Sequence, residues 1–291
     1  MTEHRCSQAG RLVARAIGVA AMIAGAAAAA GKQRFSLQVD TVRLEVMVKR
    51  GNRSVAGLQS SDFDVRDNGV AQRPNLVAYG ALPLNLVLVL DISGSVAGDR
   101  LNRLRSAGLT LINALEPDDR AAVMTFADAV IIRTPFAPIG PGLRAKMDLQ
   151  PGGTNTSLVD AMQAALVLAQ SGAGRPLLIV FSDGADTSSF LSAASVEDTA
   201  RRTGAVVYAV TTSDASGFLG GVARLTGGDR FDVGASGNLD AAFARILDEF
   251  RHSYLLSYVP SGVPPTGWHT VSVRVNGGGD VRTRPGYLAG P

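Results

Sequence analysis

The sequence predicts an α/β domain with a doubly wound, mostly parallel sheet, joined to a small accessory β domain built from the N- and C-terminal segments. Two observations support this fold class. Between residues 83 and 252, apolar runs of strand length alternate with amphipathic helical stretches, as in a parallel sheet covered by helices. On both sides of this region the hydrophobic pattern changes to period two, which is typical of half-buried antiparallel strands.

Residues 1–31 have the features of a secretory signal peptide. Three arginines precede the uncharged run 16–30, which is mostly alanine and ends in small residues. The run is short for a membrane span, and an uncleaved inner-membrane anchor is the alternative. The single cysteine, Cys6, lies inside this leader, so the mature chain would form no disulfide or zinc–thiolate site. We expect an exported protein, periplasmic or secreted.

The stretch from residue 35 to 82 is expected to supply the N-terminal part of the accessory β domain. Apolar and mainly polar residues alternate between residues 42 and 49, as in a half-buried strand. One face would hold Val42, Leu44, Val46 and Val48, and the other Arg43, Glu45, Met47 and Lys49. Further along, Asp67-Asn68-Gly69 is a turn signal that leads into another short strand.

The region from residue 83 to 252 contains four near-continuous apolar runs, as expected of strands buried on both faces of a parallel sheet. The runs are 84–90, 121–126, 177–181 and 205–210. Helices are expected at 101–115, 158–169, 192–203 and 239–250. The last has the clearest apolar stripe, and Asn238 precedes it as a candidate N-cap. A ligand site is therefore expected at the carboxyl ends of the strands.

Residues 253–289 return to the period-two pattern. Val271, Val273 and Val275 alternate with polar residues, and a glycine-rich turn leads into a last short strand. Neither this segment nor residues 35–82 offers enough strands to bury an apolar face alone. We therefore expect the two segments to pair with each other beside the α/β domain.

The charge and composition argue against nucleic acid as a partner. The formal net charge is +3, but the leader, with three arginines and one glutamate, supplies two of these charges. Only 5% of the residues are aromatic, so there is little to stack bases on. The three lysines, Lys32, Lys49 and Lys146, lie in no phosphate-binding loop, and the first strand–helix turn lacks a dinucleotide fingerprint. No nucleotide is expected.

Hydrolase chemistry is also not expected. A Ser-His-Asp triad needs a histidine beside the nucleophile. The histidines are His4 in the leader, and His252 and His269 at or beyond the far end of the α/β region. The serines that follow the first apolar run are therefore interpreted as ligands rather than nucleophiles, and the protein is predicted not to be an enzyme.

Oxygen-bearing side chains follow the strands and loops expected at one edge of the sheet. Asp91, Ser93 and Ser95 come directly after the run 84–90, Thr154 follows two glycines before a helix, and Asp183 follows the run 177–181. Two carboxylates and three hydroxyls, without histidine or cysteine, form a hard-oxygen set that suits Mg²⁺ or Mn²⁺.

These three motifs resemble, in order and spacing, the metal-ion-dependent adhesion site of von Willebrand factor type A (VWA) and integrin I domains. The resemblance implies that Ser93, Ser95 and Thr154 would be direct or near-direct ligands. Asp91 and Asp183 would bind the metal through water. Thr156 could take the place of Thr154. The neighbouring Asp99, Asp160 and Asp186 are expected to be solvated or capping carboxylates.

The segments before and after the α/β region are similar to those of exported bacterial VWA proteins with short flanking β segments. The resemblance implies a protein-binding, adhesion-type module of the cell envelope, which captures an Asp or Glu side chain of a partner protein on the metal. The alternative is a structural or assembly component of an envelope or secretion complex, in which the metal only orders the loops. A membrane would be a partner only if the leader is uncleaved.

Overall fold

The computed structural model describes residues 41–80, 82–183, 186–212, 217–234 and 237–290. The predicted signal peptide and residues 35–40 lie outside the described residues. Within the described ranges, no helix is both long and apolar enough to cross a membrane.

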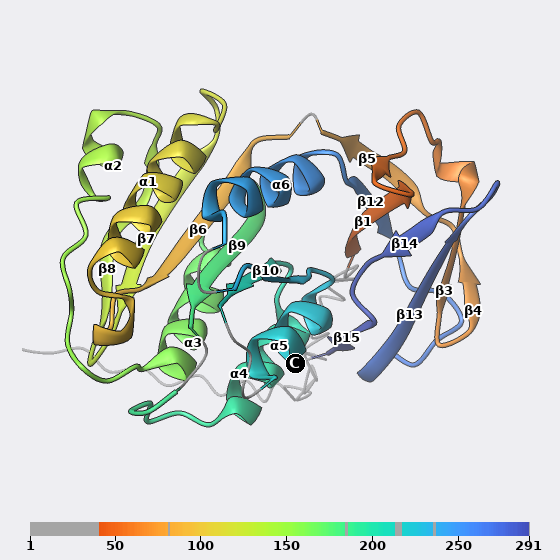
Figure 1. The fold of residues 1–291 in the computed structure, drawn as a ribbon. Coiled ribbons are helices and arrows are strands. Elements are labelled where there is room, and N and C mark those ends of the chain that lie inside the picture. Colours follow the sequence, from red (N-terminus) through yellow and green to blue (C-terminus); the bar gives the residue numbers. More distant parts are fainter. Residues whose placement is uncertain (1–40, 81, 184–185, 213–216, 235–236, 291) are drawn as a thin grey trace, which may run out of the picture. The chain divides into compact units, whose positions relative to one another are not determined.

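The α/β region is built on a six-stranded sheet with the order β11-β10-β9-β6-β7-β8 (Figure 1). Neighbouring strands run parallel, except that β8 lies antiparallel to β7 at one edge. The strands are β6 (Leu84–Asp91), β7 (Arg120–Phe126), β8 (Val130–Pro138), β9 (Arg175–Ser182), β10 (Val206–Thr211) and β11 (Arg230–Asp232). The predicted doubly wound, mostly parallel sheet is confirmed.

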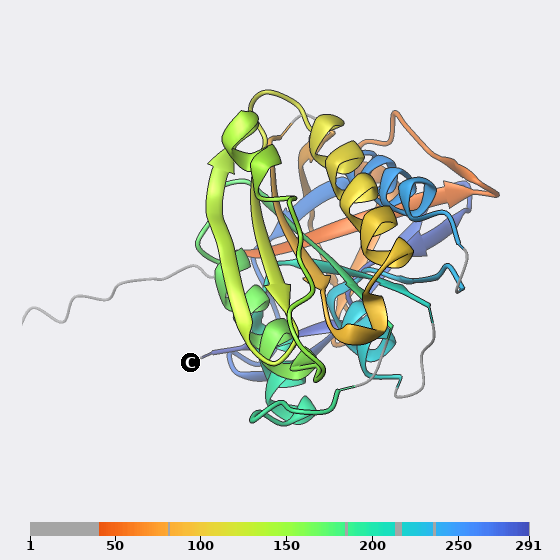
Figure 2. The same cartoon turned by 60° about the vertical axis from the view of Figure 1, so that its left-hand side comes forward.

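Helices cover both faces of this sheet. One face packs against α1 (Asp99–Asn113), α2 (Pro141–Ala145) and α6 (Leu239–Arg251), and the other against α3 (Leu158–Ala169), α4 (Ala193–Arg202) and α5 (Phe218–Thr226). Figure 2 shows α1 and α6 side by side. In β6, Leu86 and Leu88 enter the first core while Val87 and Val89 enter the second. This double burial explains why the strand is apolar along nearly its whole length.

Four elements of the α/β region were not predicted, namely β8, α2, α5 and β11. The edge strand β8 leaves Ile131 and Ile132 about half exposed, so its sequence lacks the apolar run of its buried neighbours. Helix α5 lies in a glycine-rich stretch, and glycine weakens a helical signal. Gly217 and Gly227, both with positive φ, bound this helix, and its apolar face is buried against the sheet.

Two further sheets are built from the N- and C-terminal segments, as the predicted fold class requires. One has the order β14-β1-β12-β5, with β2 paired to β1, and the other has the order β15-β13-β3-β4. In the first, Leu44 lies opposite Leu256, and in the second, Val65 lies opposite Val273. Their elements are β1 (Val42–Arg50), β2 (Arg53–Ser54), η1 (Ser60–Asp62), β3 (Phe63–Asp67), β4 (Val70–Gln72), β5 (Asn75–Tyr79), β12 (Tyr254–Tyr258), β13 (Gly267–Val275), β14 (Asp280–Arg282) and β15 (Gly286–Ala289).

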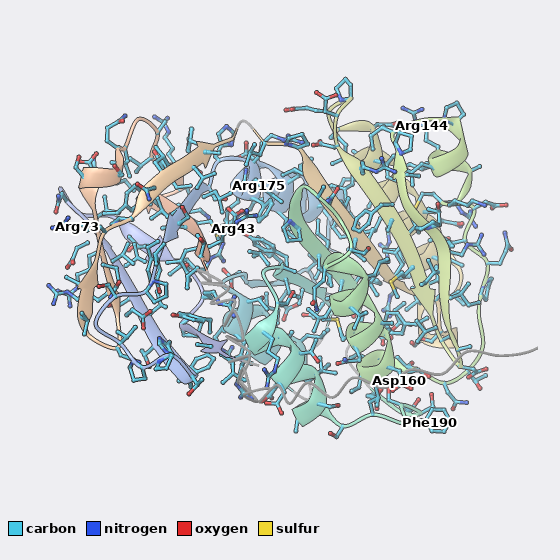
Figure 3. The ribbon with its side chains drawn as sticks, turned by 180° about the vertical axis from the view of Figure 1, so that it is seen from behind. Arg43, Arg73, Arg144, Asp160, Arg175 and Phe190 are labelled. Carbon is cyan, nitrogen blue, oxygen red and sulfur yellow. The ribbon has the colours of Figure 1, made fainter. Side chains whose placement is uncertain are left out.

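The prediction that β1 is half-buried is wrong. Its apolar face packs in the core of the flanking sheets, but Glu45 and Met47 on the opposite face are also buried. Met47 joins a core of the α/β region, and Glu45 accepts hydrogen bonds from Arg175 at the start of β9. Figure 3 labels Arg175 at this junction. The middle of the second face of β1 is therefore covered by the α/β region, while Arg43 near its start stays exposed.

Candidate metal centre

Asp91, the last residue of β6, is fully buried and fixed on both carboxylate oxygens. Its Oδ1 accepts hydrogen bonds from the Ser93 amide at 2.9 Å and the Ser93 hydroxyl at 2.6 Å. Its Oδ2 accepts from the Ser182 hydroxyl at 2.8 Å. Because Ser182 ends the neighbouring parallel strand β9, the carboxylate is held between the carboxyl ends of two strands.

The hydrogen-bond partners of Asp91 are hydroxyl and amide groups. In the described part of the chain, no lysine, arginine or histidine forms an ion pair with it. Burial raises the pKa of the Asp91 carboxyl, against the lowering effect of these hydrogen bonds. A buried carboxylate of this kind is costly unless a cation compensates it.

Two hydroxyl oxygens lie beside this carboxylate. The short η2 turn (Gly94–Val96) brings the Ser95 Oγ to 3.1 Å from the Ser93 Oγ. Ser93 is buried, while Ser95 is exposed, so the pair leads from the carboxylate to solvent. The side chains of the D-x-S-x-S motif thus lie within hydrogen-bond distance of one another at the end of β6.

The Thr154 loop lies directly against this motif. The Gly152 amide donates to the Ile92 carbonyl at 2.8 Å, and Gly153 forms an isolated parallel bridge with Ser93. A Cβ placed on Gly94 would lie 3.9 Å from the Thr154 Cα. The backbone of Thr154 therefore sits over the serine turn, and its side chain is exposed.

Thr156, the alternative ligand, is placed differently. It is 5% exposed, its amide donates to the Thr187 hydroxyl at 2.8 Å, and its carbonyl accepts from the Thr187 amide at 2.9 Å. Thr156 thus connects the loop to the segment after β9. Of the two threonines, Thr154 is the one exposed beside the serines.

Asp183 follows β9 at the same edge, and its negative charge contributes to the raised pKa of Asp91. Its Oδ2 lies 3.5 Å from the Arg100 Nη1, and the same nitrogen donates to the Ser95 carbonyl at 3.0 Å. Arg100, near the start of α1, therefore links the two motifs. Arg100 was not predicted from the sequence, because its spacing from either motif carries no signal.

Asp128, after β7, was also missed. Its Oδ1 accepts from the Asn155 amide at 2.7 Å. A Cβ on Gly153, which has a φ of 143°, would meet the Asp128 Oδ2 at 2.1 Å, so a glycine is needed where this carboxylate supports the loop. The available signal was its position: an acidic residue two places after a buried strand of the same sheet.

The other nearby aspartates act as expected of capping carboxylates. Asp186 accepts from the Val159 amide in the first turn of α3, and Asp160 accepts from two loop amides at residues 190 and 191. Asp99 is exposed at the first position of α1.

The donor chemistry fits a hard divalent cation. The structure brings the Asp91, Ser93 and Ser95 side chains together with the backbone of Thr154 and with Asp183, and these side chains offer oxygen only. Across the described ranges, no group of three or more His, Cys, Asp or Glu side chains could hold a metal. A metal at this edge would thus depend on hydroxyls, water and the two carboxylates, as Mg²⁺ coordination allows.

Comparison with known proteins identifies the α/β region. Residues 86–185 match the family model of the von Willebrand factor type A domain. A 45-residue stretch is 58% identical to a curated protein of Synechocystis sp., and it covers 16% of this chain but only 11% of that protein.

Two solved structures show the extent of the structural similarity. The PilB minor pilin of Streptococcus sanguinis aligns with a TM-score of 0.50 and 14% identity, over 61% of this chain and 63% of the pilin. An aerotolerance-related membrane protein of Bacteroides fragilis aligns with a TM-score of 0.47 and 19% identity, over 57% of this chain and 98% of its own. With the family match and the sheet order described above, the α/β region of this chain is a von Willebrand factor type A domain.

Proposed function

We propose that this protein is a metal-ion-dependent protein-binding module of the cell envelope, which captures an Asp or Glu side chain of a partner on Mg²⁺ or Mn²⁺. VWA domains are commonly protein-interaction modules, which supports the general class. The signal-peptide features of residues 1–31 support export. The envelope location and the metal dependence are parts of the proposal.

The observation that supports the metal is the buried carboxylate of Asp91, which has no cationic partner among the described residues and lies beside two serine hydroxyls. Ser93, Ser95 and Thr154 would hold the ion directly, with Asp91 and Asp183 bound through water. A shell of mainly neutral hydroxyls leaves much of the ion's charge unbalanced. Bound there, the ion would supply a Lewis-acidic position for a partner's carboxylate.

The chain's own residues fix the geometry for this capture. Ser182 and the Ser93 amide hold Asp91, Asp128 supports the Thr154 loop, and Arg100 links Asp183 to the serine turn. Thr154 and Ser95 are exposed, so a partner side chain can reach the ligands that lie nearest to solvent. Such preorganisation reduces the entropic cost of binding.

The test is capture of envelope proteins on the immobilised protein in Mg²⁺ and in EDTA. Thr154→Ala should lose the captured partner while keeping its circular dichroism spectrum. Thr110→Ala, at an exposed position of α1, serves as the matched control and should retain it. Metal and partner should each tighten the binding of the other by the same factor.

A partner that binds equally well in EDTA would contradict metal-borne capture. The alternative function, a structural or assembly component whose metal orders the loops, would then be favoured. Isothermal titration with Mg²⁺ alone would then separate a structural metal from the absence of a metal site. A structural metal would still bind the protein, whereas a protein without the site would show no binding.

A further inference from the structure

The loop after β9 presents an aromatic ring that contacts little of the protein. Phe190 is 98% exposed, and its neighbour Leu191 is 45% exposed. Figure 3 shows Phe190 on the loop beside Asp160 of α3. Single exposed apolar residues are common on protein surfaces, so exposure alone does not imply a role. The backbone that carries this ring is what distinguishes it.

The backbone of Phe190 is held firmly by one carboxylate. Asp160 accepts hydrogen bonds from the Phe190 amide at 3.0 Å and from the Leu191 amide at 2.9 Å. In return, the Asp160 amide donates to the Ser189 hydroxyl at 3.1 Å, and that hydroxyl donates to Asp186. The loop and the first turn of α3 therefore cap each other, and the exposed ring sits on an ordered segment.

The same loop is hydrogen-bonded to the Thr154 loop of the proposed metal centre. Thr187 exchanges two hydrogen bonds with Thr156 in the loop that carries Thr154. The Ser157 and Ser188 hydroxyls lie 3.0 Å apart and add a further contact. The aromatic ring and the metal ligands are thus carried by segments that are hydrogen-bonded to each other.

We infer that Phe190, with Leu191, is an apolar anchor of the partner-binding surface, carried by a segment that is hydrogen-bonded to the loop of the proposed metal centre, so that a partner contributes an acidic side chain and an apolar pocket. This inference rests on the proposed function. An aromatic ring on a pre-ordered loop can be buried at low entropic cost, and such residues dominate the energetics of protein interfaces. Asp160 is the positioning residue of this anchor.

The probe is a library of random linear peptides displayed on phage and selected on the full protein in Mg²⁺. The selected peptides should contain an Asp or Glu close to apolar residues, and they should dissociate in EDTA. Against a synthetic selected peptide, Phe190→Ser should raise the Kd by about tenfold or more. Val167→Ser, at a 56% exposed apolar position near the other end of α3, is the matched control and should leave the Kd unchanged.

Asp160→Ala tests the positioning role. It keeps the Phe190 side chain but removes the acceptor of the two loop amides that position it. The Kd should rise several-fold, and Phe190→Ser should then cost less in the Asp160→Ala background than in the wild type. Independent, additive losses would contradict the positioning role, because residues that act together show non-additive effects.

Four results would separate the alternatives. If acidic, Mg²⁺-dependent peptides bind Phe190→Ser with the same Kd as the wild type, the anchor is overturned and the proposed function is left intact. Peptides that need Phe190 but bind equally in EDTA would support the anchor and contradict metal-borne capture. A library that yields no Phe190-dependent peptide overturns the inference. The inference is also overturned if the wild type, but not Phe190→Ser, sediments with phosphatidylcholine–phosphatidylglycerol vesicles. The ring would then bind a lipid surface rather than a protein partner.

Discussion

Buried carboxylates occur at two regions of this protein, and they are compensated in different ways. Where the flanking sheets meet the α/β domain, Glu45 is paired with Arg175 at 2.8 Å and also accepts from Ser253. Asp119, at the start of β7, is paired with Arg251 at 2.6 Å. At the opposite end of the strands, Asp91 is equally buried, but hydroxyls and an amide are its partners.

Asp67, in the core of the flanking sheets, extends the same comparison. Its oxygens lie 2.7 Å from the His269 Nδ1 and within 2.9 Å of the Tyr258 and Tyr287 hydroxyls. The carboxylates of the flanking region thus find dedicated partners within the chain. Asp91 lacks a cationic partner in the described residues, and this difference is the physical reason to expect one from solution.

The largest loss of stability should come from breaking the buried ion pair between Glu45 and Arg175. Arg175→Met leaves Glu45 buried without its cation, and removing one partner of a buried ion pair costs about 3–5 kcal/mol. Urea unfolding should show this loss. The double variant Glu45→Gln/Arg175→Met should recover part of it, because no uncompensated charge remains. Equal losses in both would mean that packing of the arginine, rather than its charge, stabilises the junction.

The second effect is stabilisation by a metal ion at the carboxyl end of β6, where Asp91 lies. An ion that binds only the native state adds about 2.7 kcal/mol at 100 times its Kd, which corresponds to roughly 5–10 °C in Tm for a chain of this size. Mg²⁺ or Mn²⁺ should therefore raise the Tm of the wild type in differential scanning calorimetry. The Tm of Asp91→Ala should remain nearly unchanged.

Asp67→Asn is the control for that experiment. It alters a buried carboxylate that already has its partners, so it should lower the Tm but keep the metal-induced shift. If Asp91→Ala keeps the same shift, the metal does not bind at the end of β6.

A third effect is alkaline destabilisation at the junction, which a pKa rise of two units limits to roughly 3 kcal/mol. Burial raises the pKa of Tyr208 to about 12 from 10.0, while its hydroxyl donates to Glu249 at 2.9 Å. The unfolded chain would ionise this phenol near pH 10 and the folded chain only near pH 12. The free energy of unfolding should thus be unaffected by this group below pH 10 and fall between pH 10 and 12.

Urea unfolding across that pH range measures the effect, and Tyr208→Phe should flatten the decline. Some decline should remain, since burial also raises the pKa of Tyr258 and Tyr287. An unchanged slope in Tyr208→Phe would place the pH dependence elsewhere.

The sequence predicted best those features that one element determines by itself. Strand β6 is recognisable because both its faces are buried, and the N-cap of α6 is recognisable because Asn238 accepts from the Ala241 amide within its own turn. The D-x-S-x-S motif likewise forms its own hydrogen bonds within five residues.

Features that depend on distant segments were not predicted. Glu45 is buried because Arg175, 130 residues away, covers its side of β1. Asp128 supports the Thr154 loop through the Asn155 amide 27 residues later, and only its position two residues after a buried strand could have indicated a role there. Strand β8 is an edge strand, so its exposed face removes the apolar run by which its neighbours were found.

The smallest effect on stability should come from Asp128, and it would separate support of the site from support of the fold. Asp128 is exposed, and its hydrogen bond to the Asn155 amide is a single charge-assisted contact, so Asp128→Asn should lower the free energy of unfolding by no more than about 1 kcal/mol. Residues that hold a metal ligand in place nonetheless affect metal affinity by tenfold or more. The Kd for Mg²⁺, measured by isothermal titration, should therefore rise by about tenfold in Asp128→Asn. It should remain unchanged in Asp148→Asn, whose side chain is 76% exposed. If both variants bind Mg²⁺ as the wild type does, the Thr154 loop does not depend on Asp128 for its geometry, and the loop must be ordered by its other contacts, the Ser93–Gly153 bridge and the hydrogen bond from Gly152 to Ile92 among them.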